Sequence, residues 1–112
     1  MISFAPGANR GKEAKIRIGS NGVMRISKNG VLLAPTITHT RLMVHLTKDG
    51  VSIVVKPGET GYTVRGDDGG IECNIKRVAE YLKKIGFKLP IVYGADVRWD
   101  ANLQAWTAKM GA

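Results

Sequence analysis

The chain has 112 residues, of which 44% are hydrophobic and 23% are charged, so we expect one soluble domain with a single modest core. The 17 Lys and Arg residues outnumber the 9 Asp and Glu residues and leave a net charge of +8, which favours a polyanionic partner. Cys73 is the one cysteine and excludes an internal disulfide, and no stretch approaches the length of a secretory or membrane-spanning segment. We therefore expect a cytoplasmic protein with no membrane partner.

The first elements in chain order are a loose arm and a hairpin. Residues 1–13 are rich in Gly and Pro and are expected to form a flexible arm, and residues 14–112 form the domain. From Lys15 the hydrophobic period is two, which predicts strands in "KIRIGS" and "VMRIS". The same period places Ile16 and Ile18 on one face of the first strand. Asn21-Gly22 between the two strands is typical of a type I′ turn.

Further hairpins are predicted between residues 27 and 73. Lys28-Asn29-Gly30 indicates a second turn, with Gly30 at positive φ, followed by a strand "VLLA" that ends at Pro35. The runs "RLMVHL" and "VSIVV" flank a turn at Lys48-Asp49-Gly50, and "YTVRG" and "IEC" flank the loop "DDGG". All these strands are close enough in sequence to pair antiparallel.

The last third of the chain predicts a helix and a final hairpin. Apolar residues recur at helical spacing over 75–85, Asn74 can cap this helix, and Gly86 can end it. The side chains expected inside are those of Ile75, Val78, Leu82 and Ile85. In the tail, Asp100-Ala101-Asn102 indicates a turn, with Trp99 opposite Leu103 and Trp106 on the same face as Arg98. The predicted fold is α+β: a curled antiparallel sheet of short hairpins, one amphipathic helix and a C-terminal hairpin.

The sequence contains no complete catalytic, metal or cofactor motif. "GANRGKE" at 7–13 has three residues between its glycines and Glu13 after Lys12, so it is not a phosphate-binding loop. His39, His45 and Cys73 do not form the close pairs that zinc sites use. A start-of-helix position would lower the pKa of the Cys73 thiol, but alternation with Ile71 and Ile75 indicates inward packing. We therefore predict a protein that is not an enzyme and that needs no cofactor or metal.

Basic residues follow a pattern that suits phosphate binding. Lys15 and Arg17 share one strand face, Arg25 can lie near them across the first hairpin, and Lys28 follows in the next turn. A solvated sheet face has the same pattern, so this alternative stays open. A secondary basic surface is expected on the helix, from Lys76, Arg77, Lys83 and Lys84. Trp106 is a candidate for base stacking, with half-buried packing as the alternative.

Residues 27–57 contain "SKNGVLLAP" and "RLMVHLTKDGVSIVVKP", and this stretch resembles the DNA-binding half of AbrB-type transition-state regulators. Gly30, Val31, Leu32, Leu33 and Pro35 match the turn and the strand that ends at proline, and "VHLTKDGVSIVV" matches the later hairpin. "TITHT" departs from the short helix of that family. The resemblance implies DNA binding through basic residues and a dimer of interleaved hairpins. Residues 14–86 are also similar to small uncharacterised proteins of phages and other mobile elements.

Two functions fit these patterns. The first is a small, non-catalytic, basic protein that binds nucleic acid, as a DNA-associated regulator would, with phosphate contacts from Lys15, Arg17, Arg25 and Lys28. The second is a protein-interaction module of mobile-element type, such as an inhibitor of a host factor, which places its helix or last hairpin on an acidic protein surface. The response of binding to salt distinguishes them, because phosphate binding weakens steeply as ionic strength rises.

Overall fold

The structure is a computed structural model that describes residues 14–35, 40–67 and 69–111. The predicted arm at 1–13 and His39 lie outside these residues. The described elements in chain order are β1 (Ile16–Ile18), β2 (Val23–Ile26), α2 (Lys28–Leu32), β3 (Arg41–Leu46), β4 (Ser52–Gly58), β5 (Tyr62–Thr63), β6 (Arg65–Asp67), β7 (Gly70–Asn74), α3 (Lys76–Lys84), β8 (Ile91–Tyr93), β9 (Ala95–Asp100) and β10 (Ala105–Lys109).

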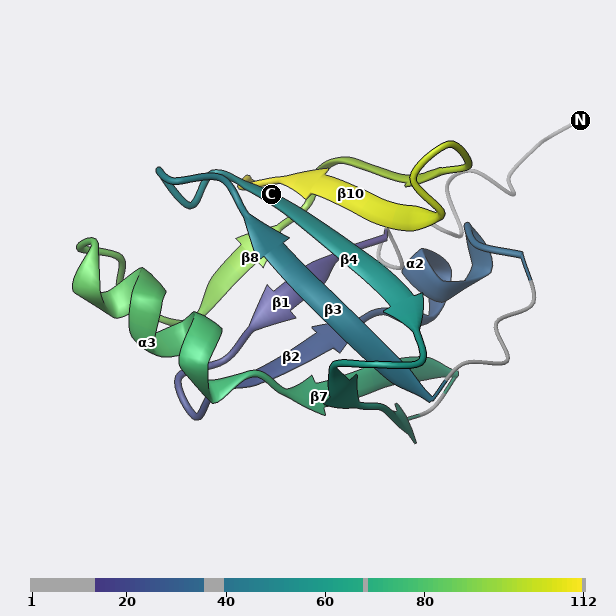
Figure 1. The fold of residues 1–112 in the computed structure, drawn as a ribbon. Coiled ribbons are helices and arrows are strands. Elements are labelled where there is room, and N and C mark those ends of the chain that lie inside the picture. The colour runs from purple at the N-terminus through teal and green to yellow at the C-terminus, as the bar shows by residue number, and fades with distance from the viewer. Residues whose placement is uncertain (1–13, 36–39, 68, 112) are drawn as a thin grey trace, which may run out of the picture.

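The strands form two antiparallel sheets of five strands each (Figure 1). The first sheet has the order β6-β7-β2-β1-β8, and the second has the order β5-β3-β4-β10-β9. The chain passes from one sheet to the other three times: between β2 and β3, where α2 lies, and by short bends at Val64, between β5 and β6, and at Gly94, between β8 and β9. Where two sheets pack on each other, a corner forms at a bend through which the chain continues from one sheet into the other. The α+β class is confirmed, with two sheets and two helices in the described residues.

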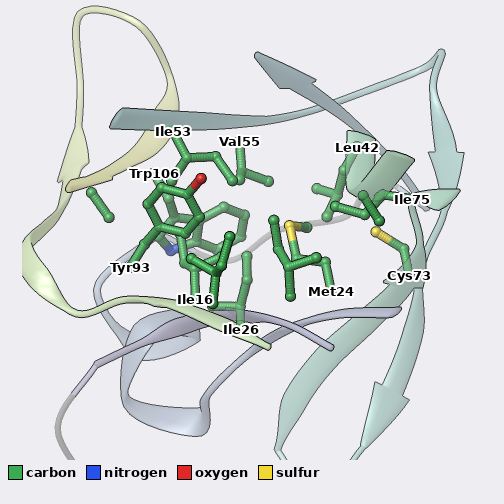
Figure 2. Close-up of a cluster of buried hydrophobic side chains, with 14 of the residues drawn as sticks. Ile16, Met24, Ile26, Leu42, Ile53, Val55, Cys73, Ile75, Tyr93 and Trp106 are labelled. Carbon is green, nitrogen blue, oxygen red and sulfur yellow. The ribbon is translucent and has the colours of Figure 1, made fainter. Parts of the chain in front are cut away.

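The core lies between the two sheets (Figure 2). Ile16, Met24 and Ile26 point from the first sheet toward Ile53 and Val55 of the second. All five side chains are fully buried, as the period of two predicted for β1 and β2. In each strand, the residues that alternate with these buried ones point to the outer face of the sheet.

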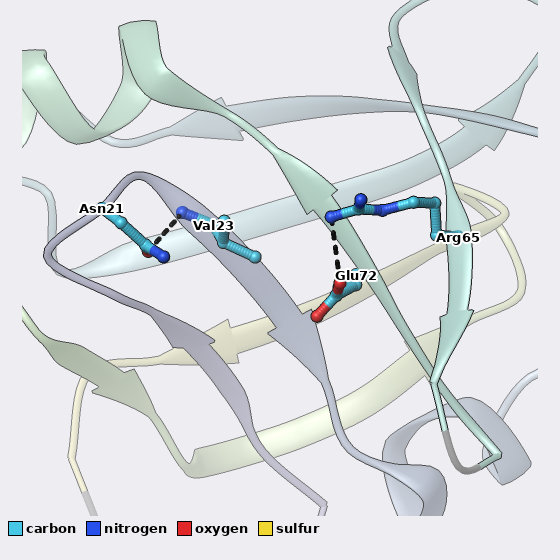
Figure 3. A network of polar contacts seen from close by, with 4 residues as sticks. All are labelled: Asn21, Val23, Arg65 and Glu72. Carbon is cyan, nitrogen blue, oxygen red and sulfur yellow. Dashed lines mark hydrogen bonds and ion pairs between the residues drawn. The ribbon is translucent and has the colours of Figure 1, made fainter.

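The first hairpin is confirmed, but its turn is not of type I′. Gly22 is the turn residue with positive φ, at 85°, and its backbone N–H donates to the carbonyl of Gly19 at 3.0 Å. The Asn21 side-chain oxygen accepts from the backbone N–H of Val23 at 3.2 Å (Figure 3). This is a longer hairpin loop closed by one left-handed glycine, so Asn21 needs no strained backbone.

The strand predicted at 31–34 is wrong, because residues 28–32 form the helix α2. Ser27 caps this helix, and its hydroxyl oxygen accepts from the backbone N–H of Gly30 at 3.3 Å. Gly30 is buried and does not have positive φ, so the predicted Asn29-Gly30 turn is also wrong. The glycine is needed for close packing, because a Cβ there would lie 2.7 Å from Cγ2 of Ile26.

The predicted helix at 75–85 is confirmed as α3, and Gly86 ends it with φ of 105°. Ala79 and Leu82 of α3 are buried, and so is Ile75, the residue just before the helix. Ile85 was predicted to be inside but is 39% exposed. It lies at the margin of the stripe that the other three residues define, where the helix ends.

The C-terminal hairpin forms with a different register from the predicted one. Trp99 pairs with Trp106, not with Leu103, because residues 101–104 are all in the loop. Asp100 stabilises this loop, since its carboxylate accepts from the backbone N–H groups of Asn102 and Leu103. The shift moves Trp106 to the inner face, where its ring meets Trp99 edge-on with centroids 5.2 Å apart.

Candidate nucleic-acid interface

Four charged residues form one row across the outer face of the first sheet. The register pairs Arg65 of β6 with Glu72 of β7, Glu72 with Arg25 of β2, and Arg25 with Arg17 of β1. Directly paired residues share a face, and their sequence neighbours in β1 and β2 point into the core. We call Arg65, Glu72, Arg25 and Arg17 the arginine row.

Like charges meet at one end of the arginine row. Arg17 and Arg25 are directly opposite each other on neighbouring strands, and like charges in this arrangement repel; Glu72 is opposite Arg25 on its other side. Arg17 is exposed, whereas Arg25 is half-buried and interacts with other protein groups. An anion above this pair would lie within reach of two guanidinium groups, which bind phosphate through paired N–H donors.

An ion pair occupies the other end of the arginine row. Nη2 of Arg65 lies 3.0 Å from Oε1 of Glu72 (Figure 3), and the Arg65 side chain is 65% exposed. A guanidinium has five N–H donors, so a phosphate can bind to Arg65 beside the carboxylate. Arg65 was not predicted as a site residue, because it is near Arg17 and Arg25 only through the pairing of β6, β7, β2 and β1.

The two predicted lysines flank the arginine row. Lys15 shares the face of Arg17, and its backbone N–H donates to the Ser27 hydroxyl at 3.0 Å. Lys28 begins α2, and its side chain passes close to Gly69 in the β6–β7 turn, where a Cβ would lie 3.1 Å from it. The structure thus brings Arg17 and Arg25 into direct contact range and places the exposed side chains of Lys15 and Lys28 on neighbouring elements.

The secondary basic surface lies on α3. Its four residues are all exposed: Lys76, Arg77, Lys83 and Lys84. The start of α3 packs on the β1–β2 turn, since a Cβ at Gly22 would lie 3.1 Å from Cα of Lys76. A hollow of about 100 Å³ between turn and helix has Lys76, Lys83 and Glu80 in its lining. The acid makes this hollow a weaker anion site than the pair of Arg17 and Arg25.

Trp106 cannot stack on a base, so this prediction is corrected. The side chain is 0% exposed, and its indole N–H donates to the carbonyl of Gly30 at 2.7 Å. The error follows from the register of the last hairpin, which was expected to place Trp106 beside Arg98 on the outer face. Its role is to join β10 to the helix α2.

Cys73 and His45 lie in different environments and cannot act together. Cys73 is buried on the inner face of the first sheet, as predicted, whereas His45 is exposed on the outer face of the second sheet. Burial, together with the nearby charge of Glu72, raises the pKa of the Cys73 thiol to about 11. Within residues 14–35, 40–67 and 69–111, no cluster of His, Cys, Asp and Glu is suited to hold a metal ion.

We expect the Cys73 thiol to react with iodoacetamide only after unfolding. The thiolate is the nucleophile, and a pKa of about 11 leaves almost none of it at mildly alkaline pH in the folded protein. The measurement is the rate of alkylation, by mass spectrometry, with and without denaturant. Rapid labelling of the native protein would contradict the assignment of Cys73 to packing.

Another hollow lies on the outer face of the second sheet, but its charges are mixed. It measures about 200 Å³ and is lined by Ser52, Ile53, Val54, Asp96, Arg98, Asp100, Thr107, Ala108 and Lys109. Nζ of Lys109 is 3.9 Å from Oδ2 of Asp96, so acids accompany both cations of this hollow. The arginine row has three cations to one acid and is therefore the better anion surface.

No family model matches the chain, and neither the curated proteins nor the solved structures contain a match. In the part of the chain that the structure describes, neither helix is long and apolar enough to cross a membrane.

Proposed function

We propose that this protein binds nucleic acid through the outer face of the first sheet and does so without catalysis. The observation that carries this proposal is the direct pairing of Arg17 with Arg25 inside the arginine row. A net charge of +8 attracts a polyanion from a distance, and the row supplies the close contacts. Both arginines are on strands whose inner residues are fully buried, so the contact groups have a rigid base.

The resemblance of residues 27–57 to AbrB-type regulators favours DNA as the partner. The hairpin of β3 and β4 forms where "VHLTKDGVSIVV" matches that family. The strand that the resemblance implies at 31–34 is replaced by the end of α2 and the residues after it. The proposal therefore depends on the basic face of the first sheet and uses the resemblance only as support for the type of nucleic acid.

A second candidate function is binding to an acidic protein, and exposed apolar side chains near α3 favour it. Tyr81, Ile85 and Val51 are 38%, 39% and 39% exposed. The Tyr81 hydroxyl donates to the carbonyl of Lys48 at 2.8 Å and so ties the helix to the β3–β4 turn. A partner with an apolar anchor and surrounding acids would fit this surface, and its binding would respond to salt less than phosphate binding does.

Replacing Lys15 and Arg17 together by glutamine is expected to weaken nucleic-acid binding by roughly ten- to a hundredfold at about 0.1 M salt. The slope of log K against log salt should fall by up to about two, because each phosphate contact contributes about 0.9. Stability should hardly change, since both side chains are exposed. Fluorescence anisotropy at several salt concentrations measures the affinity and the slope.

The matched control is the double variant Arg98→Gln with Lys109→Gln. It removes two charges from exposed positions on the second sheet and leaves the arginine row intact. The control should lose little affinity, through the change in net charge alone. Equal effects of the two double variants would contradict the proposed site and leave only a general attraction by net charge.

A further inference from the structure

We infer that the nucleic acid is double-stranded and that the arginine row lies across a groove, with contacts to the phosphate backbones on both sides and no reading of sequence. This inference rests on the proposed function. It depends on three features of the same face: the distance that the row spans, the acid at its centre, and the side chains around it.

The arginine row has the right span for a groove. Arg17 on β1 and Arg65 on β6 are separated by β2 and β7, which is three strand spacings, or about 14 Å. The major groove of B-form DNA is about 12 Å wide. This is the spacing of the backbones that carry the two arginines, and the Arg65 guanidinium lies against Glu72 at 3.0 Å. With Arg65 turned away from Glu72 toward its own edge of the sheet, the two side chains can contact the two backbones that border one groove.

The middle of the arginine row is better placed over the open groove than over a phosphate backbone. Glu72 lies between Arg65 and Arg25, and its carboxylate would repel a phosphate placed directly above it. Over a groove the same carboxylate faces water or base amino groups. A single strand that follows the row would have to carry its phosphates past Glu72, whereas a duplex presents phosphates only at the two ends.

The described side chains around the arginine row include no aromatic ring on which a base could stack. Among the residues whose side chains the structure describes, the other outward positions paired in the first sheet are not aromatic: Val23, Gly70, Asn74 and Val92. The described aromatic residues lie elsewhere, with Tyr93 and Trp106 buried, Tyr62, Phe87 and Trp99 packed on the core, and Tyr81 on α3. Single-strand binding relies on aromatic side chains that stack on bases, so this face suits phosphates alone.

The sheet also stays outside the groove. Five strands span about 19 Å, which is wider than either groove, and the groove admits a helix or a two-stranded ribbon. The valines and the asparagine beside the row are short, so they do not reach base edges from above the backbones. Binding should therefore be nearly independent of sequence.

The experiment compares a short duplex with its separate single strands, at equal phosphate concentration and several salt concentrations, by fluorescence anisotropy. We expect the duplex to bind at least about tenfold tighter, and two duplexes of unrelated sequence to agree within a factor of about three. Arg17→Gln and Arg65→Gln should each lower the duplex salt slope by about one, and the double variant by about two, because they contact different backbones. Arg98→Gln is the control and should leave the slope unchanged.

The outcomes separate this inference from the proposed function. Equal or tighter binding of a single strand, a strong preference between duplexes, or an effect of Arg17→Gln without one of Arg65→Gln would overturn the inference and leave phosphate binding in place. Absence of binding to every probe would overturn the proposed function itself. Circular dichroism of each variant confirms that it is folded, which is expected because exposed ion pairs such as Arg65 with Glu72 contribute little stability.

Discussion

Replacing Trp106 with alanine is expected to lower the free energy of unfolding by about 3 to 5 kcal/mol. The side chain is fully buried between the two sheets, and its ring packs edge-on against Trp99. Alanine would leave a large cavity and would also remove one of the two donors to the Gly30 carbonyl, which keeps only the backbone N–H of Leu33 at 3.2 Å. Both losses act at the same place, where β10 meets α2.

Trp106→Phe separates these two contributions. Phenylalanine keeps most of the apolar volume but has no N–H, so the Gly30 carbonyl loses one of its two donors and keeps that of Leu33. This loss should cost about 0.5 to 1.5 kcal/mol, with a smaller cost for lost volume. Trp99→Phe is the control, because the indole of Trp99 is only half-buried. Urea unfolding measures all three variants. A cost below about 1 kcal/mol for Trp106→Ala would mean that this tryptophan is not the residue that joins β10 to α2.

The same contact explains why α2 was not predicted. Asn29-Gly30 is typical of a hairpin turn, and "VLLA" is typical of a strand, so residues 29–34 favoured a hairpin. Two hydrogen bonds favour the helix. The Ser27 hydroxyl accepts from the Gly30 N–H and is local in sequence, whereas the Trp106 indole, which donates to the Gly30 carbonyl, comes from a strand far along the chain. The cap could have been read from the sequence, but the tertiary hydrogen bond could not.

Hairpins and α3 were predictable because their signals are local. Period-two alternation with a turn glycine located the β1–β2 and β3–β4 hairpins, and apolar residues at helical spacing located α3. The register of the last hairpin was not predictable in this way, because the loop holds four residues in place of the expected three. A register that differs by one residue turns each side chain to the other face, so Trp106 was predicted on the outer face but lies on the inner one.

The candidate site was predictable in part for the same reason. The proximity of Arg17 and Arg25 follows from one local hairpin and was expected. Arg65 joins them through two further strand pairings, and no local signal in "YTVRG" indicates which strand lies next to β7. The order of strands in a sheet depends on how the whole chain packs, so the full arginine row required the structure.

Leu82→Ala is expected to destabilise the protein by about 2 to 5 kcal/mol. Leu82 is fully buried on α3 and packs under the β3–β4 turn, where a Cβ at Gly50 would lie 2.9 Å from its Cδ2. The turn is also held by the Tyr93 hydroxyl, which donates to the carbonyl of Gly50 at 2.7 Å. The turn therefore cannot easily move to fill the cavity that alanine leaves, and this favours the upper part of the range.

Ile85→Ala is the matched control, because it removes a side chain of the same size from the same helix. Ile85 is 39% exposed, so its loss should cost about 1 kcal/mol or less. The pair tests which face of α3 is inside, since helical spacing alone placed Ile85 in the core with Leu82. Urea unfolding of both variants measures the two costs. Similar costs would mean that the helix is rotated from the orientation described. The exposed position of its basic residues would then be wrong as well, namely that of Lys76, Arg77, Lys83 and Lys84.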